Sequence, residues 1–425
     1  MKRGTKMKTG LLLSGLIAGL AASTAPSLAA DCDITVGLVM ELTGPAGEYG
    51  QAGAKSVQMA FRDFNDAGGV GGCKVVADTR DSQSQGNVAV DQATQLVNIK
   101  KVPVIIGGII SSVSIPILTS VTAPAGVVQV SPASSSPTLT QLGRDGKTKG
   151  VFFRTITSDA LQGTAAAKYA LDQGLKKIAV IHVNNDFGVN LVREFTAAYK
   201  KLGGTITATV PYNEKQSSYA SEASAAMDGD PDALYLISTP VDGATIARAW
   251  VSGGGKQSFL LNDGMNSNDF IESVGAQYLE NAYGTSSGTT PTASTEYFNS
   301  NYEAFSGGIS PTAPAADRSY DAGAIVALAI AKAGKSDAAA IKAAMPQVVA
   351  EGGTPIHAGK EEFAKALQLI KDGKPIKYEG VIGPVSFDQY GDITGPFRLW
   401  KIAGGKVTTV GEMSTDEVGK IKSGQ

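Results

Sequence analysis

The sequence predicts an α/β protein of two lobes, each built on a doubly wound parallel β-sheet with helices on both faces. From Asp33 to about Asp263, short apolar runs alternate with longer amphipathic runs, which is the pattern of βαβ units. The chain has 425 residues, too many for one compact core and suited to two. In sheets of this kind ligands bind beyond the carboxyl ends of the strands, so we expect a site in those loops.

The first thirty residues are predicted to be a cleaved secretory signal peptide, which we leave out of the fold. A basic start precedes the apolar run Leu11–Leu20, which is too short to span a bilayer, and the small-residue exit Ser27–Ala30 follows. Cys32 does not match a lipid-attachment site, because Asp31 stands where a small residue should precede it. We therefore expect a free soluble protein outside the cytoplasm.

Composition excludes several classes of function. The formal net charge is −2 and the mature part has no long basic run, which argues against a nucleic-acid partner. Two histidines and two cysteines are too few for a histidine metal cluster or a four-thiolate zinc site. We expect no metal and no other cofactor.

The two cysteines, Cys32 and Cys73, each stand just ahead of a strand-like run. If those strands are parallel neighbours, their starts lie side by side at a separation that a disulfide bridges. Export from the cytoplasm permits the bond. The alternative is two free buried thiols.

The apolar runs of the first lobe are expected to be strands at Ile34–Val39, Lys74–Ala77, Val102–Ile106, Val127–Val130 and Val151–Thr155. Apolar residues recurring on one face predict helices around Val57–Phe64 and Ala89–Val97. A further helix is expected after Ile106, with Pro116 near its start. Residues 139–150 are expected to be a polar loop.

The same alternation continues in the second lobe, with strands expected at Ile178–Val183, Thr205–Val210, Leu234–Ile237 and Phe259–Leu261. The helices between them are expected at Ala165–Leu171, Leu191–Leu202, Ala220–Met227 and Ile246–Val251. Beyond Gly284 the pattern is less regular. There we expect helices at Ala322–Ala333 and Glu361–Lys371, a strand entering a turn at Val385–Asp392, and a strand at Phe397–Ile402.

Two neighbouring strands of the first lobe end in small, hydroxyl-bearing loops, Gly107–Ser112 and Ser131–Pro137. Glycine lets a ligand approach the backbone, a helix start offers free amides to an anion, and serine hydroxyls donate or accept. This combination at Ser111 and Ser112 suits a carboxylate, while Asp263 in the other lobe suits an ammonium group. A zwitterion would then bridge the two lobes. The alternative is that these are ordinary loops.

A second hypothesis is an exported serine hydrolase that uses Ser286. Gly284–Gly288 matches the G-x-S-x-G nucleophile pattern, and His357 follows downstream. That pattern needs a helix directly after it, whereas Thr289–Pro291 follows here. With 51 glycines in the chain, chance matches are common.

Short motifs along the chain occur in a specific order and spacing: Leu42–Gly50, Asn65–Gly72, Ser131–Thr140, Phe153–Thr155 followed by Asp159 and Gln162-Gly163, Asp186–Gly188 and Gly383–Asp388. With these motifs the mature chain resembles, over nearly its whole length, the periplasmic leucine-, isoleucine- and valine-binding proteins of ABC transporters. The resemblance implies a type I periplasmic binding protein fold, a Venus flytrap of two lobes joined by a three-crossover hinge. It also implies a monomer that performs no catalysis and delivers an amino acid to an ABC transporter permease.

The resemblance further implies how the chain divides and which residues hold the ligand. Lobe 1 is expected to comprise residues 31–155 and 285–395, and lobe 2 residues 156–284 and 396–425. The amino acid's carboxylate and ammonium are expected to contact the loops carrying Ser111, Ser112, Ala133, Ser134 and Ser135, and Asp263 is expected to pair with the ammonium. The pocket is expected to be framed by Tyr49, Phe187, Thr239 and Tyr320.

Three of these positions depart from the family pattern. Phe187 stands where the family has tyrosine, Thr239 where it has an aromatic residue, and Asp263 is one methylene shorter than the usual glutamate. These changes alter the pocket beyond the α-carbon. We expect an aliphatic, branched-chain type of amino acid as the ligand. The alternatives are an amide, urea or a small aromatic acid as the ligand, or a sensor that presents its ligand to a membrane receptor.

Overall fold

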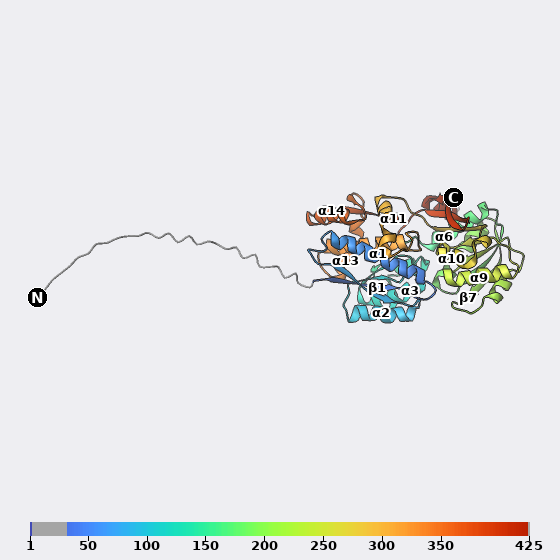
Figure 1. The fold of residues 1–425 in the computed structure, drawn as a ribbon, viewed down its shortest axis with the longest axis horizontal. Helices are drawn as coiled ribbons and strands as arrows, with labels where there is room; N and C mark the ends of the chain where they lie inside the picture. Colours follow the sequence, from blue (N-terminus) through green and yellow to red (C-terminus); the bar gives the residue numbers. More distant parts are fainter. Residues whose placement is uncertain (2–31, 424–425) are drawn as a thin grey trace. The chain divides into compact units, whose positions relative to one another are not determined.

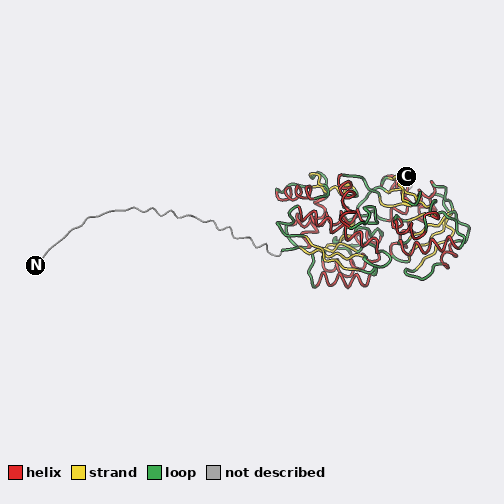
Figure 2. The backbone as a smooth tube through the Cα atoms, in the orientation of Figure 1, coloured by secondary structure: helices red, strands yellow, loops and turns green. Residues whose placement is uncertain are grey.

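Two β-sheets, each covered by helices on both faces, organise the chain (Figures 1 and 2). The computed structural model describes residue 1 and residues 32–423, so residues 2–30 of the predicted signal peptide lie outside the described residues. The strand pairs within each βαβ run are parallel. The predicted α/β class with two parallel-sheet lobes is therefore confirmed.

The sheet of lobe 1 has five parallel strands in the order β2-β1-β3-β4-β5. The order reverses between β1 and β3, so the loops after these two strands meet at the switch point where open sheets bind ligands. The strands are β1 (Ile34–Met40), β2 (Val75–Asp81), β3 (Val104–Gly107), β4 (Val128–Ser131) and β5 (Phe152–Arg154). The connecting helices are α1 (Gly47–Asp66), α2 (Gly86–Asn98), α3 (Ser111–Ile117), the π-helical turn η1 (Leu118–Thr122), α4 (Ala123–Ala125) and α5 (Pro137–Arg144).

A later part of the chain returns to cover lobe 1. It comprises α11 (Ala293–Ser306), α12 (Ala316–Ala333), α13 (Ala338–Ala344), η4 (Met345–Val348), α14 (Lys360–Lys371) and a small sheet of β11 (Thr354–Ile356), β12 (Ile376–Gly380) and β13 (Gly383–Pro384). α12 packs along α1, and the two backbones approach closely at Gly323. A Cβ there would lie 3.0 Å from the Cβ of Ala60 and 3.2 Å from the Cα of Val57. Small residues in α12 therefore set the distance between the two helices.

The sheet of lobe 2 has seven strands in the order β15-β14-β10-β9-β8-β6-β7, in which β14 runs antiparallel to both of its neighbours, β10 and β15. Its strands are β6 (Lys177–Val183), β7 (Thr205–Tyr212), β8 (Ala233–Ile237), β9 (Phe259–Leu261), β10 (Ala282–Ser287), β14 (Phe397–Ala403) and β15 (Lys406–Met413). Its helices are α6 (Asp159–Asp172), α7 (Asp186–Lys201), α8 (Ala220–Ala226), α9 (Pro240–Ser252), η2 (Asp263–Met265), α10 (Asn268–Val274), η3 (Ala276–Tyr278) and α15 (Thr415–Ser423). Among the residues described, no helix combines the length and the apolar character needed to cross a membrane.

Three local predictions were wrong. Pro116 lies inside α3, as the sixth of its seven residues, and not near its start. The other two concern residues 139–150 and 385–392. Residues 139–150 are not one polar loop, because α5 runs to Arg144, capped by the Ser136 side chain with Pro137 at its first turn. Val385–Asp392 does not form a strand; the backbone turns there, and the Asp388 carboxylate accepts hydrogen bonds from the amides of Tyr390 and Asp392. At residues 136–144 and 385–392, hydrogen bonds that backbone amides donate to the Ser136 and Asp388 side chains determine the local structure, and the hydrophobic pattern does not reveal them.

The lobes are joined by residues 155–158, 288–292 and 385–396, which lie side by side. Thr157 forms a parallel bridge with Ile393, and its hydroxyl is hydrogen-bonded to that of Ser287. β10 continues past the predicted lobe boundary at residue 284 as far as Ser287, where the second crossover begins. The lobe boundaries at single-residue level stay a prediction.

The predicted disulfide is present. Cys32 and Cys73 are the only two cysteines, and both are disulfide-bonded. They precede β1 and β2, whose first residues Ile34 and Val75 are paired in register.

Replacing both cysteines with serine is expected to lower the free energy of unfolding by roughly 3–4 kcal/mol, because the unfolded chain loses a loop constraint. Denaturant titration of the oxidised protein and of the double variant measures the difference. A difference below about 1 kcal/mol, with the bond shown intact by mass spectrometry in the parent, would contradict the expectation.

Candidate functional site

A cavity of about 340 Å³ lies between the lobes, next to the crossovers. Its walls come from both lobes: from α1, η2, α11 and α12, from the β4–α5 loop, and from β10, β14 and β15. The lining residues include Tyr49, Ala133, Ile156, Asp263, Ser286, Thr289, Thr295, Asn299, Thr312, Asp317, Arg318, Arg398 and Glu412. We treat this cavity as the candidate ligand site.

Three of the predicted ligand residues line this cavity: Tyr49 from α1, Ala133 from the β4–α5 loop, and Asp263 at the start of η2. The Tyr49 ring reaches across to lobe 2. A Cβ at Gly264 would lie 1.8 Å from the Tyr49 hydroxyl oxygen, so only glycine fits opposite this ring. An aromatic ring, a backbone loop and a carboxylate therefore meet in one space.

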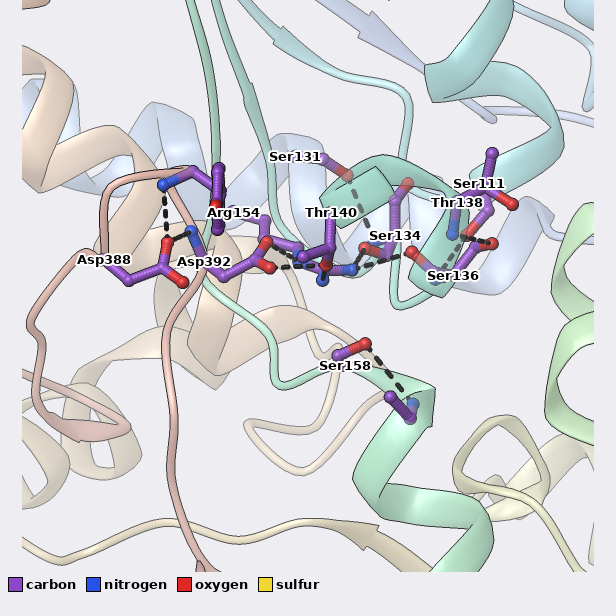
Figure 3. Close-up of polar contacts among 12 residues, drawn as sticks. Ser111, Ser131, Ser134, Ser136, Thr138, Thr140, Arg154, Ser158, Asp388 and Asp392 are labelled. Carbon is purple, nitrogen blue, oxygen red and sulfur yellow. Dashed lines mark hydrogen bonds and ion pairs between the residues drawn. The ribbon is translucent and has the colours of Figure 1, made fainter. Parts of the chain in front are cut away.

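Three of the four predicted serines, Ser111, Ser134 and Ser135, are buried, and their hydrogen bonds hold the loop that carries Ala133. Figure 3 shows Ser111 and Ser134. The Ser111 Oγ accepts a hydrogen bond from the Ser136 amide at 3.1 Å. The Ser134 Oγ donates to the carbonyl of Ile109 at 3.0 Å. The Ser135 Oγ donates to Asp159 Oδ2 at 2.8 Å. Ser112 is half-buried at the first turn of α3.

Arg154 is hydrogen-bonded to the same loop (Figure 3). Its side chain is fully buried, and its Nη1 donates to the carbonyls of Ser134 and Ser136 at 3.0 and 3.2 Å. Its Nε donates to Asp392 Oδ1 at 2.7 Å, and its Nη2 to Thr140 Oγ1 at 2.9 Å. The loop next to the cavity is thus preorganised by a buried ion pair that links β5 to the third crossover.

The amides before helix α3 are already occupied by the protein's own carboxylate. Glu41, at the end of β1, is fully buried, and its Oε2 accepts from the Ile109 amide at 3.0 Å and its Oε1 from the Ile110 amide at 3.2 Å. The prediction that this loop offers free amides to a ligand's carboxylate is therefore wrong for the amides of Ile109 and Ile110, which donate to Glu41. Burial raises the pKa of Glu41 to about 7, against the lowering effect of the amide hydrogen bonds.

Because the pKa of Glu41 is higher in the folded protein than its ordinary value of 4.5, the folded state retains a proton between pH 4.5 and 7 that the unfolded state loses. The stabilisation of the folded state by protonated Glu41 is fully present below pH 4.5, and it is lost as the pH rises to about 7. In Glu41→Gln this loss should be absent, and the unfolding free energies of the two proteins should diverge by about 3 kcal/mol across that range. Parallel pH dependences in denaturant titrations would contradict this.

Two acidic side chains lie near each other at the lobe 2 side of the site. Asp159 is fully buried at the start of α6, and its Oδ1 has no hydrogen-bond partner among the described residues. Burial raises the pKa of Asp159, and the charge of Asp263 raises it further. Burial also raises the pKa of Asp263, although hydrogen bonds from Asn262 and Gln162 oppose that effect. A cationic group between these carboxyls would relieve their mutual repulsion.

The remaining predicted residues do not line the cavity. Tyr320 lies in the core of lobe 1, where its hydroxyl donates to Asp63 Oδ2 at 2.7 Å. Phe187 is in the first turn of α7 and packs against the apolar cores of lobe 2. Thr239 precedes α9, and its buried hydroxyl has no hydrogen-bond partner among the described residues. The structure therefore brings together Tyr49, Ala133 and Asp263 but not these three.

Polar contacts also join the lobes away from the cavity. The Ser267 Oγ donates to Glu48 Oε2 at 2.6 Å. The Asn190 Nδ2 donates to the hydroxyls of Ser136 and Thr138, each at 3.2 Å. The loop that carries Ala133 is therefore tied to α7 of the other lobe, and the two lobes are held together around the cavity.

Sequence reasoning missed most of the wall formed by the crossovers and by β14. Arg318 donates through Nη2 to the carbonyl of Ser287 at 2.7 Å and through Nη1 to Asp317 at 2.6 Å. Arg398 reaches the cavity from β14. Neither arginine belongs to a local motif, so only the pairing of β14 with β10 and the position of α12 reveal them.

Ser286 lines the cavity, but its surroundings are not those of a nucleophile. It lies within β10, and its Oγ accepts a hydrogen bond from Arg398 Nε at 3.3 Å. The described part of the chain contains both histidines, and neither is hydrogen-bonded to it: His182 contacts a carbonyl in β6, and His357 Nδ1 has no partner. Nor do the described residues contain a group of three or more side chains able to hold a metal ion.

Comparison with known proteins gives a consistent assignment. The family model described as periplasmic binding protein matches residues 33–405. The Leu/Ile/Val-binding protein BraC3 of Rhizobium johnstonii is 28% identical over 400 residues, covering 93% of this chain and 99% of that protein. BasB of Halobacterium salinarum, the substrate-binding protein of a chemotactic signal transduction system, is 26% identical and covers 83% of each chain.

A solved structure shows the same fold. The leucine-binding protein LivK of Thermotoga maritima superimposes with a TM-score of 0.76 at 22% identity, covering 90% of this chain and 99% of that one. The two-lobed arrangement described above is therefore the same fold as that structure, and the candidate cavity lies at the junction of the lobes.

Proposed function

Because this chain belongs to the periplasmic binding protein family, we propose that it is a solute receptor of an ABC transporter that binds a free amino acid between its lobes. The receptor acts in the periplasm and delivers the amino acid to a membrane permease. It carries out no chemical reaction on the ligand. The amino acid specificity of BraC3, whose whole length this chain nearly covers, supports the ligand class.

The observation that carries the proposal is the placement of Asp263 opposite Tyr49 and Ala133 in one cavity between the lobes. An ammonium group placed there pairs with the Asp263 carboxylate and reduces its repulsion with Asp159. The backbone at Ala133 and the aromatic face of Tyr49 provide the neighbouring contacts. We propose these three residues as the core of the ligand site, with Ser111, Ser134 and Ser135 supporting it.

Ligand binding would favour the closed arrangement of the lobes. The contacts between Glu48 and Ser267 and between Asn190 and the α5 start form only when the lobes are together. A ligand that contacts Tyr49 on one lobe and Asp263 on the other lowers the free energy of the closed state further. The permease then recognises the closed form.

A second role on the same fold is ligand sensing. It is favoured by the similarity to BasB, which serves a chemotactic signalling system. Deletion of the gene separates the roles, because loss of amino acid uptake supports transport, whereas loss of chemotaxis with normal uptake supports sensing.

The test of the proposed function is calorimetry on the protein without its first thirty residues, after unfolding and refolding to remove bound ligand. A panel of the twenty common amino acids is titrated, and saturable one-to-one binding of at least one member is expected. Absence of binding across the panel, by a protein shown to be refolded by circular dichroism, would overturn the amino acid proposal.

A further inference from the structure

We infer that two contacts between the lobes, Tyr49 with Gly264 and Glu48 with Ser267, form a latch whose closure sets the affinity for the amino acid. Gly264, Glu48 and Ser267 act as positioning residues, since none of the three is among the described residues that line the cavity. This inference rests on the proposed function, because it assumes that the amino acid is held between closed lobes.

Gly264 is a point at which the two lobes touch. It is buried in η2 of lobe 2, and the Tyr49 ring reaches it from α1 of lobe 1. A Cβ at Gly264 would lie 1.8 Å from the Tyr49 hydroxyl oxygen and 3.1 Å from the ring carbon Cζ. Tyr49 is only 9% exposed, so its ring has little room to turn aside. Even alanine at position 264 would therefore hold the lobes apart.

The backbone of Gly264 also supports the group proposed to bind the ammonium. Its amide is hydrogen-bonded to the Asp263 carboxylate and so opposes the rise in the pKa of Asp263 that burial causes. When Tyr49 closes on Gly264, lobe 1 therefore packs against the backbone that positions this carboxylate. The contact with Gly264 and the ligand contact at Asp263 form in the same movement of the lobes.

The second contact of the latch comes from the residue before Tyr49. The Ser267 Oγ donates to Glu48 Oε2 at 2.6 Å. Ser267 is 2% exposed, and its Oγ accepts from the Phe270 amide at 3.1 Å, which caps α10. A hydroxyl group has one hydrogen to donate, and that of Ser267 goes to Glu48. Because the cap fixes Ser267 within lobe 2, the contact forms only when α1 approaches.

The lobes are not packed tightly around the latch. A groove of about 250 Å³ runs beside it between the lobes. The groove is lined by Gly44, Pro45, Gly47, Glu48, Pro240, Val241, Asp269, Glu272 and Ser273. No continuous apolar interface therefore reinforces the two contacts along this groove, and the loss of either contact should be measurable.

Calorimetry on the refolded protein tests the latch. Each of the twenty common amino acids is a probe, and comparisons refer to the one that the unmodified protein binds most tightly. Gly264→Ala is expected to lower that affinity by about tenfold or more, because the lobes no longer close fully. Adding Tyr49→Phe should recover part of the loss, since it removes the oxygen that the new Cβ would meet at 1.8 Å.

Two controls accompany this pair of variants. Tyr49→Phe alone measures any effect of the missing hydroxyl group on binding. Gly419→Ala, in α15, is the matched glycine control, because a Cβ there would meet no atom within 4 Å. Its affinity should equal that of the unmodified protein.

Small-angle scattering distinguishes a failure to close from a lost ligand contact. The unmodified protein is expected to become more compact at saturating amino acid, whereas Gly264→Ala should keep the radius of gyration of the ligand-free form. Glu48→Ala should weaken binding by about threefold or more, while Glu48→Gln keeps an acceptor for Ser267 and most of the affinity. Glu48 is half-buried at the rim, so these two variants test the latch even if Gly264→Ala does not fold.

The outcomes separate the inference from the proposed function. Parent-like affinity in Gly264→Ala, or in Glu48→Ala if the glycine variant does not fold, overturns the latch while the proposed function stands. A loss in Gly264→Ala that Tyr49→Phe does not reduce, or that accompanies full compaction, also overturns it. Binding of none of the twenty amino acids by the unmodified protein overturns both.

Discussion

Replacing Arg154 with methionine is expected to destabilise the protein by about 3–5 kcal/mol, the largest effect we predict for a single substitution. The change leaves Asp392 as a charge without its partner at 2.7 Å, and it removes the donors to the carbonyls of Ser134 and Ser136. The Arg154 side chain is fully buried and that of Asp392 is 11% exposed, so water compensates little of the loss. Denaturant titration measures the effect as a lower midpoint with an unchanged slope.

The control for this substitution is Arg193→Met. The Arg193 side chain is 61% exposed, and its pair with Glu194 is a surface pair, so stability should stay within about 0.5 kcal/mol. A loss of less than about 1 kcal/mol in Arg154→Met would show that the buried pair does not hold the loop. Recovery of stability by the double change Arg154→Met with Asp392→Leu would support the unpaired charge as the cause.

Replacing Asp263 with asparagine is expected to weaken binding of the amino acid by about 1–3 kcal/mol or more, because the ammonium group loses its charged partner. The side chain keeps its size, so the cavity keeps its shape. Affinity of the unmodified protein should also fall as the pH is lowered through the raised pKa of Asp263, since a proton then competes with the ammonium group. That part of the pH dependence should be absent in Asp263→Asn.

Calorimetry at several pH values measures both effects. Asp230→Asn serves as the control, because that carboxylate is on the surface of lobe 2 with a side chain 83% exposed, and affinity should not change. If Asp263→Asn binds the amino acid as tightly as the parent, the ammonium group is held elsewhere, and the site around Tyr49 and Ala133 needs to be reassigned.

Much of the fold was predictable because the strands of both lobes are short, buried and separated by amphipathic helices. Burial on both faces made β1 and β8 continuous apolar runs. The α5 helix was missed because its start consists of serines and prolines, which also mark loops. Local pattern does not distinguish a capped helix start from a turn when the helix is only eight residues long.

Two of the three predicted residues that line the cavity follow a strand, whereas Tyr49, in α1, was predicted from the family resemblance. Asp263 and Ala133 occupy such positions, and both line the cavity. Glu41 was not predictable as the carboxylate that occupies the amides of the Ile109 loop, since 68 residues separate the partners. Tyr320 was placed at the pocket by resemblance, but the packing of α12 on α1 puts its ring in the core of lobe 1. Such positions depend on contacts between distant segments, which periodicity does not reveal.

The crossovers that connect the lobes also contribute to the wall of the cavity, through Ile156 and Thr289. A molecule bound in the cavity would therefore contact the segments that join the two lobes. We expect the length of the ligand to set the angle between the two lobes. Ligands of different length should consequently give complexes of different radius of gyration in solution scattering, even where their affinities are equal.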